Sequence, residues 1–253
     1  MSKPVKIMLV GLVAAGLAGI LFFATLPMWL GPAIKAAVEQ VGPRLTKTTV
    51  KLGEVEISPW HGLVQIKGLE VGNPAGFKAP TAMKLGTARI RMNMLSILSG
   101  TAVIHEILVE APELTWEGGL SKSNFTTIQD NVTSASPKGP EKAAAEQPEK
   151  RASSSFSIKL LIEDFTFREG KMAAHVDAGP IGQSDLSLRL PSVHLTDIGK
   201  ETGGATPEQA VSAVFSAITR SATGAVTDSI KPMGEAGKGA VSKAGESLKG
   251  LFK

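Results

Sequence analysis

Three glycines at which strand patterns change phase are the strongest constraint on how this chain folds. In residues 50–94 apolar and polar residues alternate, as in half-buried β-strands, and the alternation slips by one residue after Gly53, Gly68 and Gly86. Because side chains in a strand repeat every two residues, such a slip is typical of a β-bulge, which bends the strand and keeps one face apolar. The pattern therefore predicts a curved sheet. The alternative is a flat antiparallel sheet in which some of these glycines form turns.

Further strand patterns extend this sheet. Alternation returns in residues 102–110, 112–116 and 155–195, so the sequence predicts roughly ten strands in all. Most connections between them are too short for a crossover helix, which favours an antiparallel sheet in a mainly β fold with some α-helix. Stacked at about 4.8 Å, ten strands would make a sheet about 50 Å long.

An uncharged apolar stretch runs from Ile7 to Leu30, about the length that crosses a hydrocarbon core of roughly 30 Å. Residues 1–30 are therefore predicted to form a cytoplasmic tip and a single-pass transmembrane anchor, with the rest of the chain outside the cytoplasm. The stretch exceeds the apolar core of a signal peptide and lacks a small-residue cleavage pattern, which favours an uncleaved signal anchor. The candidate anchor residues are Ile7, Leu12, Leu17, Leu21, Phe22 and Trp29.

Amphipathic segments are expected both before and after the strands in the sequence. Residues 31–45 have apolar side chains along one side and predict a short amphipathic helix after the anchor. In residues 201–253 apolar residues recur at helical spacing, which predicts amphipathic C-terminal helices or a tail. Thr206, Pro207 and Gln209 give this region an N-cap, a first-turn proline and a capping-box partner. The pattern leaves open whether the tail binds the membrane, the sheet or neither.

The sheet region is expected in two parts, residues 46–132 and 155–200. Between them, residues 133–154 hold three prolines, many charges and no large apolar side chain. Such a segment buries too little apolar surface to offset its ordering entropy, so it is predicted to be a disordered insertion.

The composition argues against catalytic and nucleic-acid-binding classes. The chain has no cysteine, which excludes disulfides and thiol nucleophiles, and no phosphate loop, nucleophile elbow or metal-ligand spacing is present. His61, His105, His175 and His194 lie far apart in the sequence. A net charge of +4 and 5% aromatic residues are too little for a nucleic-acid surface. We therefore expect no enzyme, cofactor, metal site or nucleic-acid partner, and expect the chain to meet anionic lipid head groups.

Several segments resemble the N-terminal module of the AsmA-like proteins of bacterial envelopes. They are GLVQIKGLEVGNPAGF (residues 62–77), AVIHEILVEAPELTWE (102–117), a following Ser-Asn-Phe, and LPSVHLTDIG (190–199). The resemblance covers most of residues 5–220, and Gly-Leu-x-Val-x-Asn-Pro is its most specific part. It implies a chorein-like, taco-shaped β-groove, anchored in the inner membrane with most of the chain in the periplasm, that serves lipid transport in envelope biogenesis. It supplies no catalytic residues.

Two functional hypotheses follow. In the first, the apolar groove binds or transfers phospholipid acyl chains. In the second, the chain is a non-transporting scaffold for envelope or outer-membrane assembly, and its own helices or a partner fill the groove. The expected partners are membrane lipids, other envelope proteins, or a second copy packed on the small residues Gly11, Ala15 and Gly19 of the anchor. The residues that share a phase after each glycine are the predicted lining of the groove: Val55, Ile57, Leu69, Val71, Ile90 and Met92.

Overall fold

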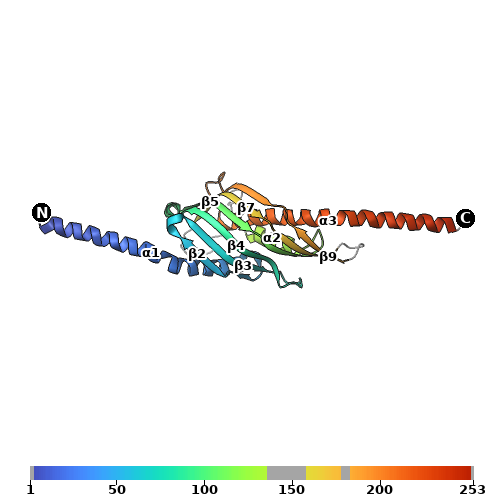
Figure 1. The fold of residues 1–253 in the computed structure, drawn as a ribbon, viewed down its shortest axis with the longest axis horizontal. Coiled ribbons are helices and arrows are strands. Elements are labelled where there is room, and N and C mark those ends of the chain that lie inside the picture. Colours follow the sequence, from blue (N-terminus) through green and yellow to red (C-terminus); the bar gives the residue numbers. More distant parts are fainter. Residues whose placement is uncertain (1–2, 136–157, 178–182, 252–253) are drawn as a thin grey trace, which may run out of the picture.

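A computed structural model describes residues 3–135, 158–177 and 183–251. These residues form one curved, open β-sheet of ten strands, and α-helices pack against one of its faces, here called the inner face. The two longest helices run lengthwise along this face and project from opposite ends of the sheet (Figure 1). The expected mainly β fold with a curved sheet is confirmed.

The elements follow one another in a simple order. The helices are α1 (Lys3–Thr46), α2 (Asn124–Ala135) and α3 (Pro207–Leu251), and two short 3-10 helices are η1 (Pro59–His61) and η2 (Met94–Ser99). The strands are β1 (Val50–Lys51), β2 (Glu54–Ser58), β3 (Leu63–Gly72), β4 (Thr81–Asn93), β5 (Thr101–Glu110), β6 (Glu113–Gly118), β7 (Lys159–Arg168), β8 (Lys171–Asp177), β9 (Gln183–Arg189) and β10 (Val193–Ile198).

Several of these strands lie end to end. Both β1 and β2 pair with β3, and both β5 and β6 pair with β4. Beyond them, β7 and β8 continue alongside β5 and β6, and β10 and β9 lie alongside β7 and β8. The described strands thus form a sheet six strands wide, which at about 4.8 Å per step is about 25 Å. The predicted length of about 50 Å is wrong because it counted the two halves of bent strands separately.

The sheet is mixed, and the predicted purely antiparallel sheet is wrong. Strand β5 runs parallel to β7, and β6 runs parallel to β8, whereas the other pairs are antiparallel. Parallel neighbours require a connection that returns across the sheet. Residues 119–158 make this connection between β6 and β7, and α2 lies within it.

A row of bends crosses the sheet where the end-to-end strands meet. Gly53, Gly68 and Gly86 lie side by side on adjacent strands, and the Gly53 N–H donates to the Gly68 carbonyl oxygen at 3.0 Å. Gly68 has φ +65°, a left-handed conformation that favours glycine. The pairing of β3 with β4 keeps the same register on both sides of the glycines. The phase slips are therefore aligned bends and not turns. The β-bulges predicted at these glycines are wrong, because a bulge would shift the register.

The bend row continues through the remaining strands without glycine at the strained positions. Ala111 (φ +48°) separates β5 from β6, and Glu169 (φ +59°) separates β7 from β8. Backbone hydrogen bonds hold the row together, from the Ala111 N–H to the Arg168 oxygen (3.0 Å) and from the Leu190 N–H to the Gly170 oxygen (2.8 Å). All strands therefore bend along one line, which we call the bend row.

Helix α2 occupies the end of the first predicted sheet region, residues 46–132. Ser123 caps this helix: its Oγ accepts from the Thr126 N–H at 3.2 Å. Phe125, Ile128 and Val132 recur at helical spacing and are fully buried. Residues 133–135 end this helix, and the rest of the predicted insertion lies outside the described residues.

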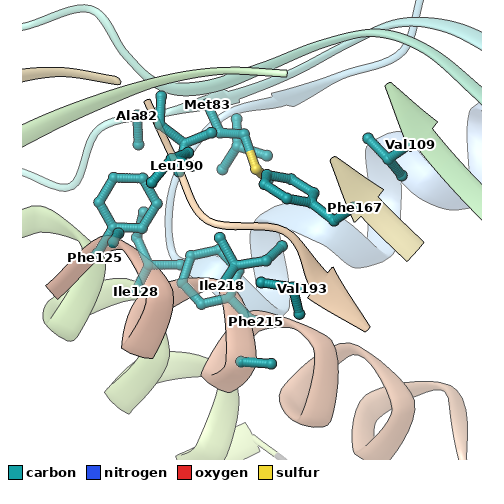
Figure 2. Packing of buried hydrophobic residues seen from close by; sticks show 14 of the residues in the cluster. Ala82, Met83, Val109, Phe125, Ile128, Phe167, Leu190, Val193, Phe215 and Ile218 are labelled. Carbon is teal, nitrogen blue, oxygen red and sulfur yellow. The ribbon is translucent and has the colours of Figure 1, made fainter. Parts of the chain in front are cut away.

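Aromatic side chains join both helices to the sheet. Trp116 of β6 stacks on Phe125 at a centroid distance of 5.9 Å, and Phe125 stacks on Phe215 of α3 at 6.0 Å. Figure 2 shows Phe125 and Phe215 pointing from their helices toward the sheet, where Leu190 and other apolar side chains meet them. This aromatic stack is the centre of the hydrophobic core.

The predicted start of the C-terminal helix is confirmed. The Thr206 N–H donates to Gln209 Oε1 at 2.9 Å, and the Gln209 N–H donates to Thr206 Oγ1 at 3.3 Å. Helix α3 begins at Pro207 and continues to Leu251 as one helix, although its side chains beyond Lys231 lie outside the described part. The buried stripe of α3 includes Phe215, Ile218, Ala222 and Val226.

Helix α1 joins the predicted anchor and the predicted short helix of residues 31–45 into one element. Pro27 and Pro32 each remove a backbone hydrogen bond, but the helix continues past them to Thr46 because its last turns pack on β1 and β2. The Asn131 side chain of α2 donates to the Thr46 carbonyl oxygen at 2.9 Å. The C-terminal part of α1 is thus fixed to the sheet.

The candidate anchor residues lie in the projecting part of α1. Leu12 is 70% exposed, Leu17 is 62% exposed and Trp29 is 50% exposed. The side chains of Ile7, Leu21 and Phe22 lie outside the described residues. Across the part of the chain that the structure describes, no helix offers a stretch long and apolar enough to cross a membrane.

Candidate functional site

The six predicted groove residues all lie on the inner face of the sheet. Strand β2 carries two, β3 carries two and β4 carries two. Only Val71 is buried, at 6% exposure, and the other five are half-buried: Val55, Ile57, Leu69, Ile90 and Met92. A set of apolar side chains that is neither buried nor solvated is the feature to explain.

The bend row divides this set in two. Val55, Ile57, Ile90 and Met92 lie between the bend row and the turns η1 and η2, in what we call the proximal half of the inner face. Leu69 and Val71 lie beyond the row, in the distal half that β1, β6, β8 and β9 complete. The six residues share the inner face but lie on both sides of the bend row, because antiparallel neighbours approach the bend from opposite directions.

Residues before the glycines belong to the same face, which the sequence prediction omitted. Direct cross-strand pairing places Val64 between Ile57 and Ile90, and Ile66 opposite Val55. The signal was available, because the apolar phase before Gly68 had only to be assigned to the same side of a bent strand. Two apolar rows cross the whole proximal half: Ile57, Val64, Ile90, Ile107, Phe165 and Leu195, and then Val55, Ile66, Ala88, Val109, Phe167 and Val193.

The helices cover the two halves unequally. Helix α1 packs mainly on β1 and β2, α3 on β7 to β10, and α2 on β6. In the distal half, Trp116, Phe125 and Leu114 are at most 2% exposed. In the middle of the proximal half, Ile90 and Ile107 stay half-buried between α1 and α3. The distal half is a closed core. In the proximal half six of the twelve row residues are buried as well, among them Val109 and Phe167, and the other six, including Ile90 and Ile107, are incompletely covered.

The opposite face of the sheet, which we call the outer face, is charged. Arg91 pairs with Glu106 at 2.9 Å across β4 and β5. Arg168 pairs with Glu110 at 2.6 Å, and this hydrogen bond holds the pKa of the Glu110 carboxyl below its usual value. Such cross-strand ion pairs mark a solvated surface. The sheet is therefore strongly two-sided, with apolar rows on one face and charges on the other.

Three of the four histidines lie on the outer face, and His61 lies in the turn η1 at the end of the sheet. His61 accepts or donates a hydrogen bond with Ser58 Oγ at 2.8 Å. The other three pair separately with carboxylates: His105 with Glu163 (2.9 Å), His175 with Asp185 (2.7 Å) and His194 with Asp164 (2.5 Å). Within the described residues, no group of three or more metal-ligand side chains comes together.

The most specific motif residues form a buried polar cluster. The Asn124 amide donates to Asn73 Oδ1 at 2.7 Å and to the Thr115 carbonyl oxygen at 2.6 Å. Glu117 accepts from the backbone N–H of Lys78 at 2.6 Å and thereby holds the loop after Asn73. The Asn-Pro and Ser-Asn-Phe segments thus contact each other and fix α2 onto the sheet. Their positions explain a structural role and place no reactive group in the proximal half.

No family model, curated protein or solved structure matches this chain. The function is therefore argued from the inner face itself.

Proposed function

We propose that this protein is anchored in a membrane by residues 7–30 and binds lipid acyl chains on the proximal half of its sheet. What supports this is a single observation: two apolar rows six strands wide lie there, and six of their twelve residues, with Ile90 and Ile107 at the centre, are only half-buried. Apolar surface of this extent is costly in water and is favoured when hydrocarbon covers it. The outer face carries ion pairs and is stable in water without such cover.

The proposal includes the location and kind of function that the AsmA-like resemblance implies. The anchor is set in a bacterial inner membrane with a cytoplasmic N-terminus, and the sheet is periplasmic. A sheet about 25 Å wide accommodates acyl chains but does not span the space between two membranes. A single copy therefore receives, holds or passes on phospholipid as one part of a transport route in envelope biogenesis.

Photocrosslinking from position 90 tests this proposal. A photoreactive amino acid at Ile90 in the membrane-extracted full chain is expected to give lipid adducts, which mass spectrometry identifies. Position 83 is the matched control, because Met83 lies on β4 beyond the bend row and is 7% exposed in the closed core. It is expected to capture peptides of the chain itself. Peptide adducts alone from position 90 would overturn the lipid-binding proposal.

A scaffold with a filled groove is the second candidate, and one observation favours it. Helix α3 already buries Phe215, Ile218 and Ala222 against one edge of the sheet, where it packs on β7 and β10 of the proximal half as well as on β8 and β9. If the helices or a partner protein likewise cover the proximal half in the cell, the protein carries no lipid. Position 90 would then capture α1, α3 or another protein, and mass spectrometry of the purified chain would find no stoichiometric phospholipid.

A further inference from the structure

Two turns at one end of the sheet expose large apolar side chains. Trp60 of η1 is 72% exposed, and Leu95 and Leu98 of η2 are 67% and 84% exposed. We call these three residues the collar. Isolated exposed apolar residues are common on soluble proteins, but adjacent turns with several of them mark an interaction surface.

The fold holds the leucines of the collar outward. In a 3-10 helix residues three apart lie on the same side, so η2 presents Leu95 and Leu98 together while Met94 and Ile97 are half-buried. The Ser96 hydroxyl accepts from the Val103 N–H at 2.9 Å, which ties the turn to β5. An ordered turn therefore presents these leucines, and their exposure is not the result of a frayed loop.

The collar lies at the end of the sheet from which α1 projects. Helix α1 contacts η1, and Gly31 packs so closely on β2 that a Cβ there would lie 2.8 Å from the Val55 oxygen. The Met92 N–H donates to the Gly62 oxygen at 2.8 Å, which joins the end of η1 to the strand that leads into η2. The N-terminal part of α1 projects beyond the sheet, as Figure 1 shows. The exposed apolar residues of α1 that precede Gly31 include Trp29, at 50%, and Met28, at 83%.

We propose that the collar inserts into the head-group boundary of the same bilayer that holds α1. This inference rests on the proposed anchor and adds a second contact with the membrane. Neither Pro59–His61 nor Met94–Ser99 contains a carboxylate, so nothing there is repelled by anionic lipid. An indole ring suits the interface, and the leucines bury apolar surface beside it. The continuity of the collar with the apolar part of α1 favours a bilayer over a partner protein.

An embedded collar would hold the apolar rows at a fixed position relative to the membrane. Ile57 immediately precedes η1 and Met92 precedes η2, so both lie next to the collar on the inner face. If the collar is embedded, the proximal half opens at the lipid surface, and an acyl chain reaches it without crossing water. A helical anchor alone would leave the sheet free to tilt away from the membrane.

Depth-dependent quenching in vesicles tests the collar. The chain has no cysteine, so a single Leu98→Cys substitution accepts one fluorophore without further changes. The full chain is reconstituted in vesicles of phosphatidylethanolamine and phosphatidylglycerol that carry nitroxide on shallow acyl positions. We expect quenching several-fold stronger at position 98 than at the control Ser187→Cys, which is exposed on β9 at the other end of the sheet.

The outcomes separate this inference from the proposed function. If the labelled protein floats with the vesicles but the fluorophores at positions 98 and 187 are quenched equally, the proposed insertion of the collar is wrong and the proposed anchor is supported. If the protein does not float, both the anchor and the collar are wrong. Strong quenching at position 98 supports the collar even if crosslinking from position 90 finds no lipid. As a further check, Leu95→Asp in the Leu98→Cys background should weaken the quenching several-fold and leave the melting temperature unchanged, because Leu95 is exposed.

Discussion

Replacing Gly68 by alanine tests whether the bend row is a strained and necessary feature. Gly68 has φ +65°, and a Cβ added there would lie 3.6 Å from the Gly53 Cα, an ordinary contact distance. The cost of Gly68→Ala is therefore conformational and not steric. A left-handed conformation costs an L-residue about 1–2 kcal/mol. An alanine also loses less chain entropy on folding than glycine does, which returns about 0.5–1 kcal/mol. The expected net loss of stability is about 1 kcal/mol.

Gly86→Ala is the matched control, because Gly86 belongs to the same row on the neighbouring strand. It does not have a positive φ, and a Cβ there would meet nothing within 4 Å. Gly86→Ala should reduce the conformational entropy of the unfolded chain without straining the folded backbone. It should therefore stabilise the fold by about 0.5 kcal/mol. Gly68→Asn provides a second control, since asparagine tolerates the left-handed region better than alanine and should recover part of the loss.

Thermal unfolding of the detergent-solubilised chain, followed by circular dichroism, measures these differences. For a chain of this size, 1 kcal/mol corresponds to about 2–4 °C, so the two alanine variants should differ by roughly 3–6 °C. Equal melting temperatures for Gly68→Ala and Gly86→Ala would show that the bend does not depend on backbone strain at Gly68. The physical account of the phase slip would then be wrong.

Three further substitutions test the core and the outer face. Asn124→Leu should destabilise the fold by about 2–4 kcal/mol in urea unfolding, because Asn124 is fully buried and its half-buried partners Asn73 and Thr115 lose their hydrogen bonds. Phe215→Ala should cost about 3–5 kcal/mol, whereas Val211→Ala on the same helix, at 40% exposure, should change stability by less than about 0.5 kcal/mol. The His194 hydrogen bond lowers the pKa of Asp164 from its ordinary 3.8, so its contribution is present above that pH and is lost as pH falls below it. Urea unfolding of Asp164→Asn should accordingly show a weaker fall in stability with acid than wild type, and parallel curves would contradict this.

Local patterns gave the bends and the helix start because they depend on near neighbours. A one-residue phase slip at Gly53, Gly68 and Gly86 has few explanations in a strand, and a bulge is the one that keeps a single face apolar. The Thr206 to Gln209 capping box is likewise complete within one helical turn. The bends and the helix start are confirmed because the interactions that decide them lie within a few residues of each other. The predicted β-bulges are wrong, because the strands keep one register across the three glycines, which shows only in the pairing with neighbouring strands.

Long-range relations were missed because local patterns do not contain them. The parallel pairing of β5 with β7 depends on the direction in which the chain re-enters the sheet. The polar tract before β7 has no pattern that indicates this direction. Helix α2 was missed although Phe125, Ile128 and Val132 have helical spacing, because three apolar residues in a polar segment are a weak signal. For the same reason the sequence did not show that the bend row divides the six candidate residues into two groups. Only the pairing of the strands shows which apolar residues lie next to each other.

The bend row gives a physical reason for a closed core and a half-covered surface on one sheet. A flat sheet packs helices evenly, but a sheet bent along one line directs its two halves toward different neighbours. Beyond the row, the Asn73–Asn124 hydrogen bond holds α2 in place, and Trp116, Phe125 and Phe215 fill the space. Before the row no comparable helix lies over β4 and β5 among the described residues, because α1 and α3 keep to opposite edges. The aromatic core therefore gathers beyond the row, while the incompletely covered apolar side chains of Ile90 and Ile107 lie before it. The lipid-binding proposal requires this difference in cover.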